Sequence, residues 1–270
     1  MRHFVIVGIL VIVVAVLTYV GLDSAGLMPV PASAQAGPID WLWDLQIRAM
    51  SFLFSLIVVP MVYSLVVFRR RKGDTSDAEH IEGNTKLEIA WTILPLFVVV
   101  GMAYLGAQNL GETRRVDPEA MVVRVTGFQW GWTFEYPDYG ITSKELYLPV
   151  NRQVLLKMSS RDVIHSFWVP EFRVKQDLVP GRVTELRITP TVVGDQYKVR
   201  CAEICGTSHA YMESPVIVVE KADFEVWLAG QQALAAEAAQ TPEGRGQALV
   251  VANGCAACHS IDGSRGIGPT

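Results

Sequence analysis

The sequence has too few cysteines and too little net charge for several common classes of protein. Only four of its 270 residues are cysteine, and they form two close pairs, so none is left for a structural disulfide framework. The net charge of −4 argues against a general nucleic-acid-binding protein. No internal repeat is visible, so a repeat architecture is excluded. The cysteines therefore point to metal or cofactor chemistry.

Charge is also missing from three long apolar runs, at residues 4–20, 49–68 and about 89–110, the last interrupted only by small and polar residues. Each approaches the roughly 20 residues that cross a bilayer. The basic run 69–72 (Arg-Arg-Arg-Lys) lies between the second and third. Positive residues in short loops stay in the cytoplasm, so the second run goes inward and the third outward. Everything after about Asn109 is expected outside the cytoplasm.

The first apolar run allows two interpretations. Arg2, the run itself and Ala32-Ser33-Ala34-Gln35-Ala36 form the pattern of a secretory signal, cleaved after Ala34 or Ala36. Against cleavage, the run is longer than a usual signal core, and about 14 residues separate it from Ala34. We therefore predict residues 1–36 to be a signal peptide or a first membrane segment, and residues 37–112 to be a membrane hairpin.

From about residue 121 the pattern changes to short alternating runs bounded by turn residues. We predict strands at residues 121–126, 130–136, 145–148, 153–158, 183–189, 196–200 and 216–220. About seven strands in roughly a hundred residues indicate a β-sandwich or Greek-key barrel. The Ala/Gln-rich residues 222–246 are predicted to be a linker that is partly helical at most. Residues 247–254 are predicted to form a helix.

One short stretch carries most of the chemistry. Cys201, Cys205, His209 and Met212 lie within twelve residues, and His165 lies upstream. Two thiolates, imidazoles and a thioether suit copper better than zinc, and hard cations hardly at all. A surface disulfide or a zinc site is the alternative. Neither explains the set, because a disulfide does not use His209 or Met212, and zinc rarely binds thioether.

A second motif stands near the end of the chain. Cys255-Ala256-Ala257-Cys258-His259 is the C-x-x-C-H signature of covalent haem c, in which both thiols add to the haem and His259 binds its iron. A chance match or a zinc motif is the alternative.

With these motifs the chain resembles subunit II of the haem–copper oxidases, the family of cytochrome c oxidase. The resemblance extends to residues 88–95 (EIAWTILP), 129–136 (QWGWTFEY) and 175–182 (KQDLVPGR), and covers roughly residues 40–225 in the family's order. Gly131 departs from the family, whose members usually carry an aromatic residue there.

The resemblance implies a membrane-anchored all-β chain, with N-terminal transmembrane helices and an extracytoplasmic cupredoxin domain at residues 117–221. It further implies a dinuclear copper centre, known as copper A. By position, Cys201 and Cys205 would bridge two coppers, and His165 and His209 would each bind one. Met212 and the backbone carbonyl of Glu203 would be the weak axial ligands.

Three further roles follow from the same resemblance. The Glu203 carboxylate would help to bind magnesium at the interface with the catalytic subunit; the alternative is a solvated loop carboxylate. Trp130 would be the point where electrons arrive, and otherwise a core aromatic. Glu88 would be the mouth of a proton path, and otherwise an interfacial carboxylate.

The implied function is that of the electron-accepting subunit of a terminal respiratory oxidase in the bacterial plasma membrane. Its partners would be the catalytic subunit I, which reduces oxygen to water, and cytochrome c or another electron donor. The alternatives are the corresponding subunit of a nitric oxide reductase, or a tethered copper-binding protein without turnover. A quinol oxidase is disfavoured, because its second subunit has lost copper and this chain has the full set of ligands.

Some family members carry a fused cytochrome c domain, and residues 247–270 are expected to begin one. A cytochrome c fold needs roughly 80 residues to bury its haem. Only eleven residues follow His259, and none is Met, Cys or His. We therefore expect the natural chain to continue past Thr270, so that this α-helical cytochrome c start is truncated.

Overall fold

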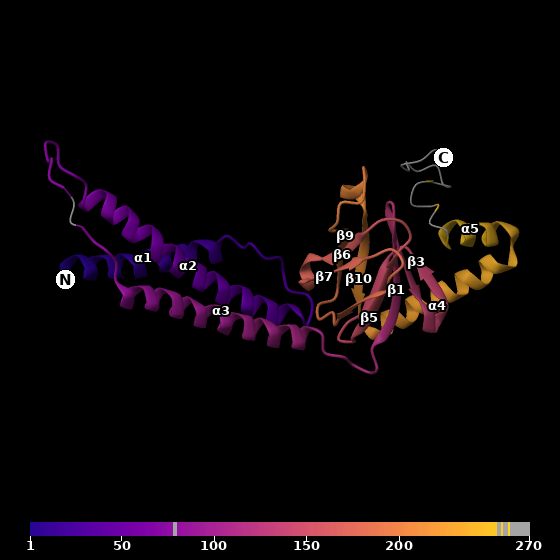
Figure 1. The fold of residues 1–270 in the computed structure, drawn as a ribbon. Coiled ribbons are helices and arrows are strands. Elements are labelled where there is room, and N and C mark those ends of the chain that lie inside the picture. The colour runs from indigo at the N-terminus through magenta and orange to yellow at the C-terminus, as the bar shows by residue number, and fades with distance from the viewer. Residues whose placement is uncertain (78–79, 253–254, 256–258, 260–270) are drawn as a thin grey trace. The chain divides into compact units, whose positions relative to one another are not determined.

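The computed structural model describes residues 1–77, 80–252, 255 and 259, and the chain divides into two compact units (Figure 1). The membrane unit contains Met1–Pro29 and Pro38–Gly111. The β unit contains Val30–Gly37 and Glu112–Thr270. A short piece of chain from the N-terminal region thus belongs to the β unit.

Within its described residues, the membrane unit has three long helices: α1 (Arg2–Ser24), α2 (Ala36–Val67) and α3 (Thr85–Thr113). All three are long and apolar enough to cross a bilayer, which confirms the three predicted runs. At most 11% of any apolar window is buried inside the chain. Their apolar surface must therefore be covered by lipid or by other membrane helices.

The described part of the β unit is a sandwich of two five-stranded sheets. One has the order β3-β2-β1-β5-β8 and the other β4-β10-β9-β6-β7. The strands are β1 (Met121–Phe128), β2 (Gly131–Tyr136), β3 (Ile141–Ser143), β4 (Leu146–Pro149), β5 (Val154–Ser160), β6 (His165–Val169), β7 (Val174–Leu178), β8 (Thr184–Ile188), β9 (Gly194–Cys201) and β10 (Glu213–Val219). β1 with β5 and β4 with β10 are parallel pairs, and the remaining pairs are antiparallel. The predicted cupredoxin-like sandwich is confirmed.

The core follows from the period of two in the strands. In β1, Met121, Val123 and Val125 are buried while Arg124 between them is exposed. β5 and β10 repeat the pattern, and the buried side chains of both sheets form one hydrophobic cluster. Each fully buried aliphatic side chain contributes about 1.5–3 kcal/mol relative to exposure.

The seven predicted strands are present, but β3, β6 and β7 were not predicted. β3 has only three residues. β6 shows no alternation, because His165, Ser166 and Phe167 are all buried in the middle of a sheet, between β7 and β9. A strand covered on both faces loses the period that sequence patterns rely on.

Residues 222–246 are more helical than predicted, since α4 (Lys221–Gln240) and α5 (Pro242–Ala252) occupy them. Phe224 and Leu228, one turn apart, are buried against the sandwich, and Trp227 stacks on Tyr147 with ring centroids 4.3 Å apart. Pro242 is the first residue of α5, and it separates this helix from α4. The predicted linker is therefore attached to the β unit at its start.

We predict that Phe224→Ala lowers the free energy of unfolding of the β unit by about 3 kcal/mol, because it empties a buried aromatic position. Val226, in the same turn, is 72% exposed, so Val226→Ala should change stability by less than about 0.5 kcal/mol. Denaturant unfolding monitored by fluorescence measures both. Equal effects would mean that α4 does not pack on the sandwich.

Candidate metal centre

Two neighbouring strands bring the candidate ligands together. β6 begins at His165, and β9 ends at Cys201; the two strands pair at Phe167 and Cys201. The loop that follows Cys201 returns into β10 at Glu213. The Cys201 amide donates a hydrogen bond to the Met212 carbonyl over 3.1 Å, which ties both ends of this loop together.

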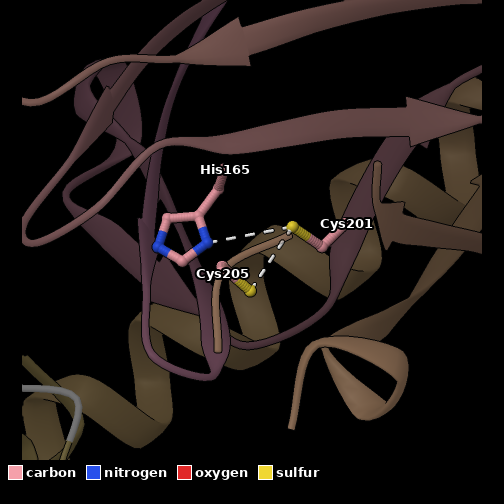
Figure 2. A group of neighbouring side chains, drawn as sticks. All are labelled: His165, Cys201 and Cys205. Carbon is pink, nitrogen blue, oxygen red and sulfur yellow. Dashed lines mark hydrogen bonds between the residues drawn. The ribbon is translucent and has the colours of Figure 1, made fainter. Parts of the chain in front are cut away.

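The predicted ligand atoms converge on two sulfur atoms. Figure 2 shows His165, Cys201 and Cys205 pointing toward one another. Cys201 Sγ lies 3.8 Å from Cys205 Sγ, 3.8 Å from His165 Nδ1 and 3.2 Å from the Glu203 carbonyl oxygen. Cys205 Sγ lies 3.5 Å from His209 Nδ1 and 3.8 Å from Met212 Sδ. Each sulfur thus has one imidazole and one weaker ligand beside it.

This arrangement fits metal binding and excludes a disulfide in this structure. A disulfide holds its sulfurs about 2.05 Å apart, whereas these cysteines are free. A metal ion lies about 2.3 Å from a thiolate, so one ion can contact both sulfurs. The donor set has two halves, each with one thiol and one imidazole, and it is mostly soft, which suits two copper ions.

The two thiols differ strongly in acidity. Burial opposes ionisation of Cys201, but hydrogen bonds with His165 and the backbone outweigh it and lower its pKa to about 6. Burial, followed by the charge on Cys201, raises the pKa of Cys205 to about 12. At neutral pH the pair therefore carries one negative charge. A cation between the sulfurs would remove the repulsion and release the proton of Cys205.

Asp162 holds the His165 ring, a role that sequence patterns did not assign to any residue. His165 Nε2 donates to Asp162 Oδ1 over 2.8 Å, so Nδ1 is left to face Cys201. Asp162 Oδ2 accepts the Gln129 amide at 2.7 Å. Gly127 lies against the ring, where an added Cβ would come within 3.2 Å of His165 Cδ2. The only available signal was that Asp162 lies three residues before His165.

Trp130 lies in the turn between β1 and β2, and not in a strand as predicted, since β2 begins at Gly131. Its indole Nε1 donates to the Cys205 carbonyl at 3.2 Å. Gly206 permits this contact, because it has φ +124° and an added Cβ would lie 3.0 Å from the Trp130 ring. Trp132, by contrast, is buried in the core next to Phe167.

The remaining predicted residues are not part of this cluster. The Glu203 side chain is exposed, although its carbonyl faces Cys201. Glu88 belongs to the membrane unit, in the first turn of α3, and is exposed there. Cys255 and His259 follow α5, and Cys258 lies outside the described residues.

Comparison with known proteins extends over both units. The sequence matches the family models for cytochrome c oxidase subunit II, transmembrane domain, at residues 18–107, and periplasmic domain, at residues 141–222. Cytochrome c oxidase subunit 2 of Synechocystis is 35% identical over an alignment of 266 positions that covers 79% of this chain and 79% of its own. That of Thermostichus vulcanus is 36% identical and covers 78% of this chain and 80% of its own.

Quinol oxidase subunit 2 of Bacillus spizizenii is also similar, with 31% identity over 80% of this chain and 71% of its own. The identity and the coverage show that the chain belongs to the family of cytochrome c oxidase subunit II.

Proposed function

We propose that the β unit receives electrons at Trp130 and passes them, one at a time, through two copper ions to the catalytic subunit of a terminal oxidase. The family assigns an electron-accepting role, a membrane anchor and an extracytoplasmic copper domain. The observation that carries the proposal is the convergence of two imidazoles, one thioether and one carbonyl on two thiol sulfurs 3.8 Å apart. Reduction of oxygen would take place in the partner subunit.

The side chains of this site would act mainly by staying in place. Cys201, Cys205, His165 and His209 would hold the copper ions, with Met212 and the Glu203 carbonyl as weaker ligands. Bound copper supplies reversible one-electron oxidation and reduction. Because four of the five ligating side chains belong to one loop held between two paired strands, their positions change little with the charge of the site.

The full chain in detergent should therefore bind two coppers, turn purple and give an electron-spin signal from one electron shared by two nuclei. Cys205→Ser should abolish the shared signal, because it removes a bridge. Ser208→Ala, in the same loop, should leave it intact. Met212→Leu should keep both coppers and shift only the reduction potential. A blue spectrum from a single copper in the unaltered chain would contradict the dinuclear site.

Asp162 would position His165 for copper, as carboxylates commonly do behind a ligating imidazole. Asp162→Ala should weaken copper binding about 10–100-fold and shift the reduction potential, because the ring loses its partner. Asp162→Asn keeps a carbonyl oxygen that accepts a hydrogen bond from His165 Nε2, so this variant should lose less copper affinity than Asp162→Ala. Asp195→Ala removes the same charge from an exposed position at the start of β9. Copper titration should find the affinity of Asp195→Ala unchanged. Equal losses of copper affinity in Asp162→Ala and Asp195→Ala would mean that Asp162 acts only through its negative charge.

Trp130 would deliver electrons through its hydrogen bond to the Cys205 carbonyl. Trp130→Ala should slow reduction of the copper site by the electron donor more than tenfold, at nearly unchanged copper content and donor affinity. Trp168, a partly exposed tryptophan on β6, provides the matched control. In Trp168→Ala the donor should reduce the copper site at close to the normal rate. Stopped-flow absorption measures both. Normal kinetics in Trp130→Ala would mean that Trp130 serves only in packing.

Two carboxylates are proposed to serve the assembled oxidase. The exposed Glu203 carboxylate would supply one oxygen ligand to a magnesium ion shared with the catalytic subunit, since magnesium takes oxygen ligands. Glu203→Gln should then lower magnesium content at unchanged copper content. Glu88 would be the mouth of a proton path, and Glu88→Gln should slow proton uptake. An unchanged magnesium content in Glu203→Gln would contradict the magnesium role. An unchanged rate of proton uptake in Glu88→Gln would contradict the proton-path role.

We also propose that Cys255, Cys258 and His259 attach haem c. The His259 amide donates to the Cys255 carbonyl at 2.9 Å, which places these residues one turn apart. A peptide that contains Cys255 and Cys258 should carry the added mass of a haem. A peptide without it, isolated from a host that matures c-type cytochromes, would exclude attachment.

The quinol oxidase alternative is disfavoured by the ligands themselves. A quinol oxidase delivers electrons without this copper centre, whereas the complete set of soft ligands is present and converges here. A nitric oxide reductase would use the same set of copper ligands. Turnover of the assembled complex with oxygen or with nitric oxide therefore distinguishes an oxidase from a nitric oxide reductase.

A further inference from the structure

The chain between α1 and α2 is built into the β unit by backbone hydrogen bonds and one isolated β-bridge. We call residues Ala32–Gln35 the strap. The Ala32 amide donates to the Glu171 carbonyl at 2.9 Å, and the Ala32 carbonyl accepts the Thr191 amide at 3.0 Å. The Ala34 amide donates to the Thr189 carbonyl at 2.9 Å, and Ser33 forms an antiparallel bridge with Pro190.

The strap side chains are also fitted to the sandwich. Ala32 is fully buried and belongs to the hydrophobic core cluster. The Ser33 hydroxyl donates to the Phe172 carbonyl at 2.9 Å, and Gln35 Oε1 accepts the Thr189 amide at 3.0 Å. Buried polar groups without partners would cost free energy, and here both have them. The strap therefore shows the satisfied hydrogen bonds and the burial of a permanent element.

This location conflicts with the signal-peptide interpretation of the same residues. Leader peptidase requires small residues at the last and third-last positions before the cut. A cut after Ala34 or Ala36 would discard Ala32 and Ser33 with the leader. The folded domain would then lose a core side chain and most of the hydrogen bonds described above. Two alanines of the Ala-x-Ala pattern, Ala32 and Ala36, are fully buried, which explains small residues at these positions as well.

The helix before the strap is itself fastened to α2, by polar contacts near both of its ends. Tyr19 donates to Asp44 at 2.8 Å, and Arg48 pairs with Asp44 at 2.5 Å and lies over the Tyr19 ring. Near the other end, His3 Nδ1 lies 2.7 Å from the Tyr63 hydroxyl. Polar residues of membrane helices usually mark fixed helix contacts. α1 has 23 residues, longer than the core of a signal peptide and sufficient to span.

We propose that α1 is a permanent third transmembrane helix, and that the strap is a fixed part of the copper domain and not a processing site. Arg2 then lies on the cytoplasmic side, and α1 runs outward. The chain crosses the membrane, contributes the strap to the β unit, and returns as α2. The proposal rests on backbone and side-chain contacts that the copper chemistry does not use.

The first test measures the mass of the mature chain, purified from its membranes through a C-terminal tag. The peptide that contains Tyr19 should be recovered, and the intact mass should include α1. Ala34→Lys gives a matched comparison, because Ala34 is exposed and a lysine there blocks cutting after either Ala34 or Ala36. Wild type and variant should differ only by the substitution. A wild-type chain that begins anywhere after Ser24 would overturn the retained helix.

The second test measures hydrogen exchange in the same full-length protein. The amides of Ala32 and Ala34 should exchange at least 100-fold more slowly than in an unstructured chain, because both are hydrogen-bonded within the sandwich. Ser33→Ala should raise these exchange rates and leave the copper spectrum unchanged. Exchange at unstructured rates in the wild type would overturn the strap. Failure of the copper-binding predictions would change neither the mass nor the exchange result. The proposal for α1 and the strap can therefore be tested separately from the proposed function.

Discussion

The hydrogen bond from the Cys201 amide to the Met212 carbonyl closes the loop that carries four of the five proposed ligand side chains. With the loop closed at this point, Cys205 and His209 have little freedom, and their sulfur and nitrogen atoms face Cys201 and one another. β6 pairs with β9 directly beside it and supplies the fifth side chain, His165. A site for electron transfer benefits from this rigidity, because every bond that must move with oxidation state raises the barrier to transfer.

A second layer of hydrogen bonds connects the ligands to the surface where electrons would arrive. Asp162 accepts hydrogen bonds from the His165 ring and from the Gln129 amide. The side chains of Gln129 and Trp130 both donate hydrogen bonds to the Cys205 carbonyl. The turn between β1 and β2 is thus tied to both halves of the site. A change at Trp130 or Gly206 acts directly on the backbone around Cys205.

The sequence predicted the elements whose signals are local, and failed where tertiary contacts decide. Thiols and imidazole at fixed spacing predicted a group of side chains that the structure brings together, and charge-free runs predicted the membrane helices. Asp162 was not predicted as the partner of His165, because that contact depends on the turn before β6. The helix α4 was taken for a linker, since only its packing through Phe224 and Trp227 distinguishes it from other alanine-rich segments. The Ala-x-Ala pattern at residues 32–36 allowed cleavage, and only the hydrogen bonds to residues 171–172 and 189–191 show that this segment is built into the β unit.

We propose that electrons reach the catalytic subunit only through the pair of sulfurs at Cys201 and Cys205. This route can be followed by injecting a single electron with a light pulse and recording the absorption of the assembled oxidase. The copper band should bleach first and recover at the rate at which the haem of the catalytic subunit is reduced. Reduction of that haem at full speed without transient bleaching, or at an unchanged rate in the Cys205→Ser variant, would contradict it.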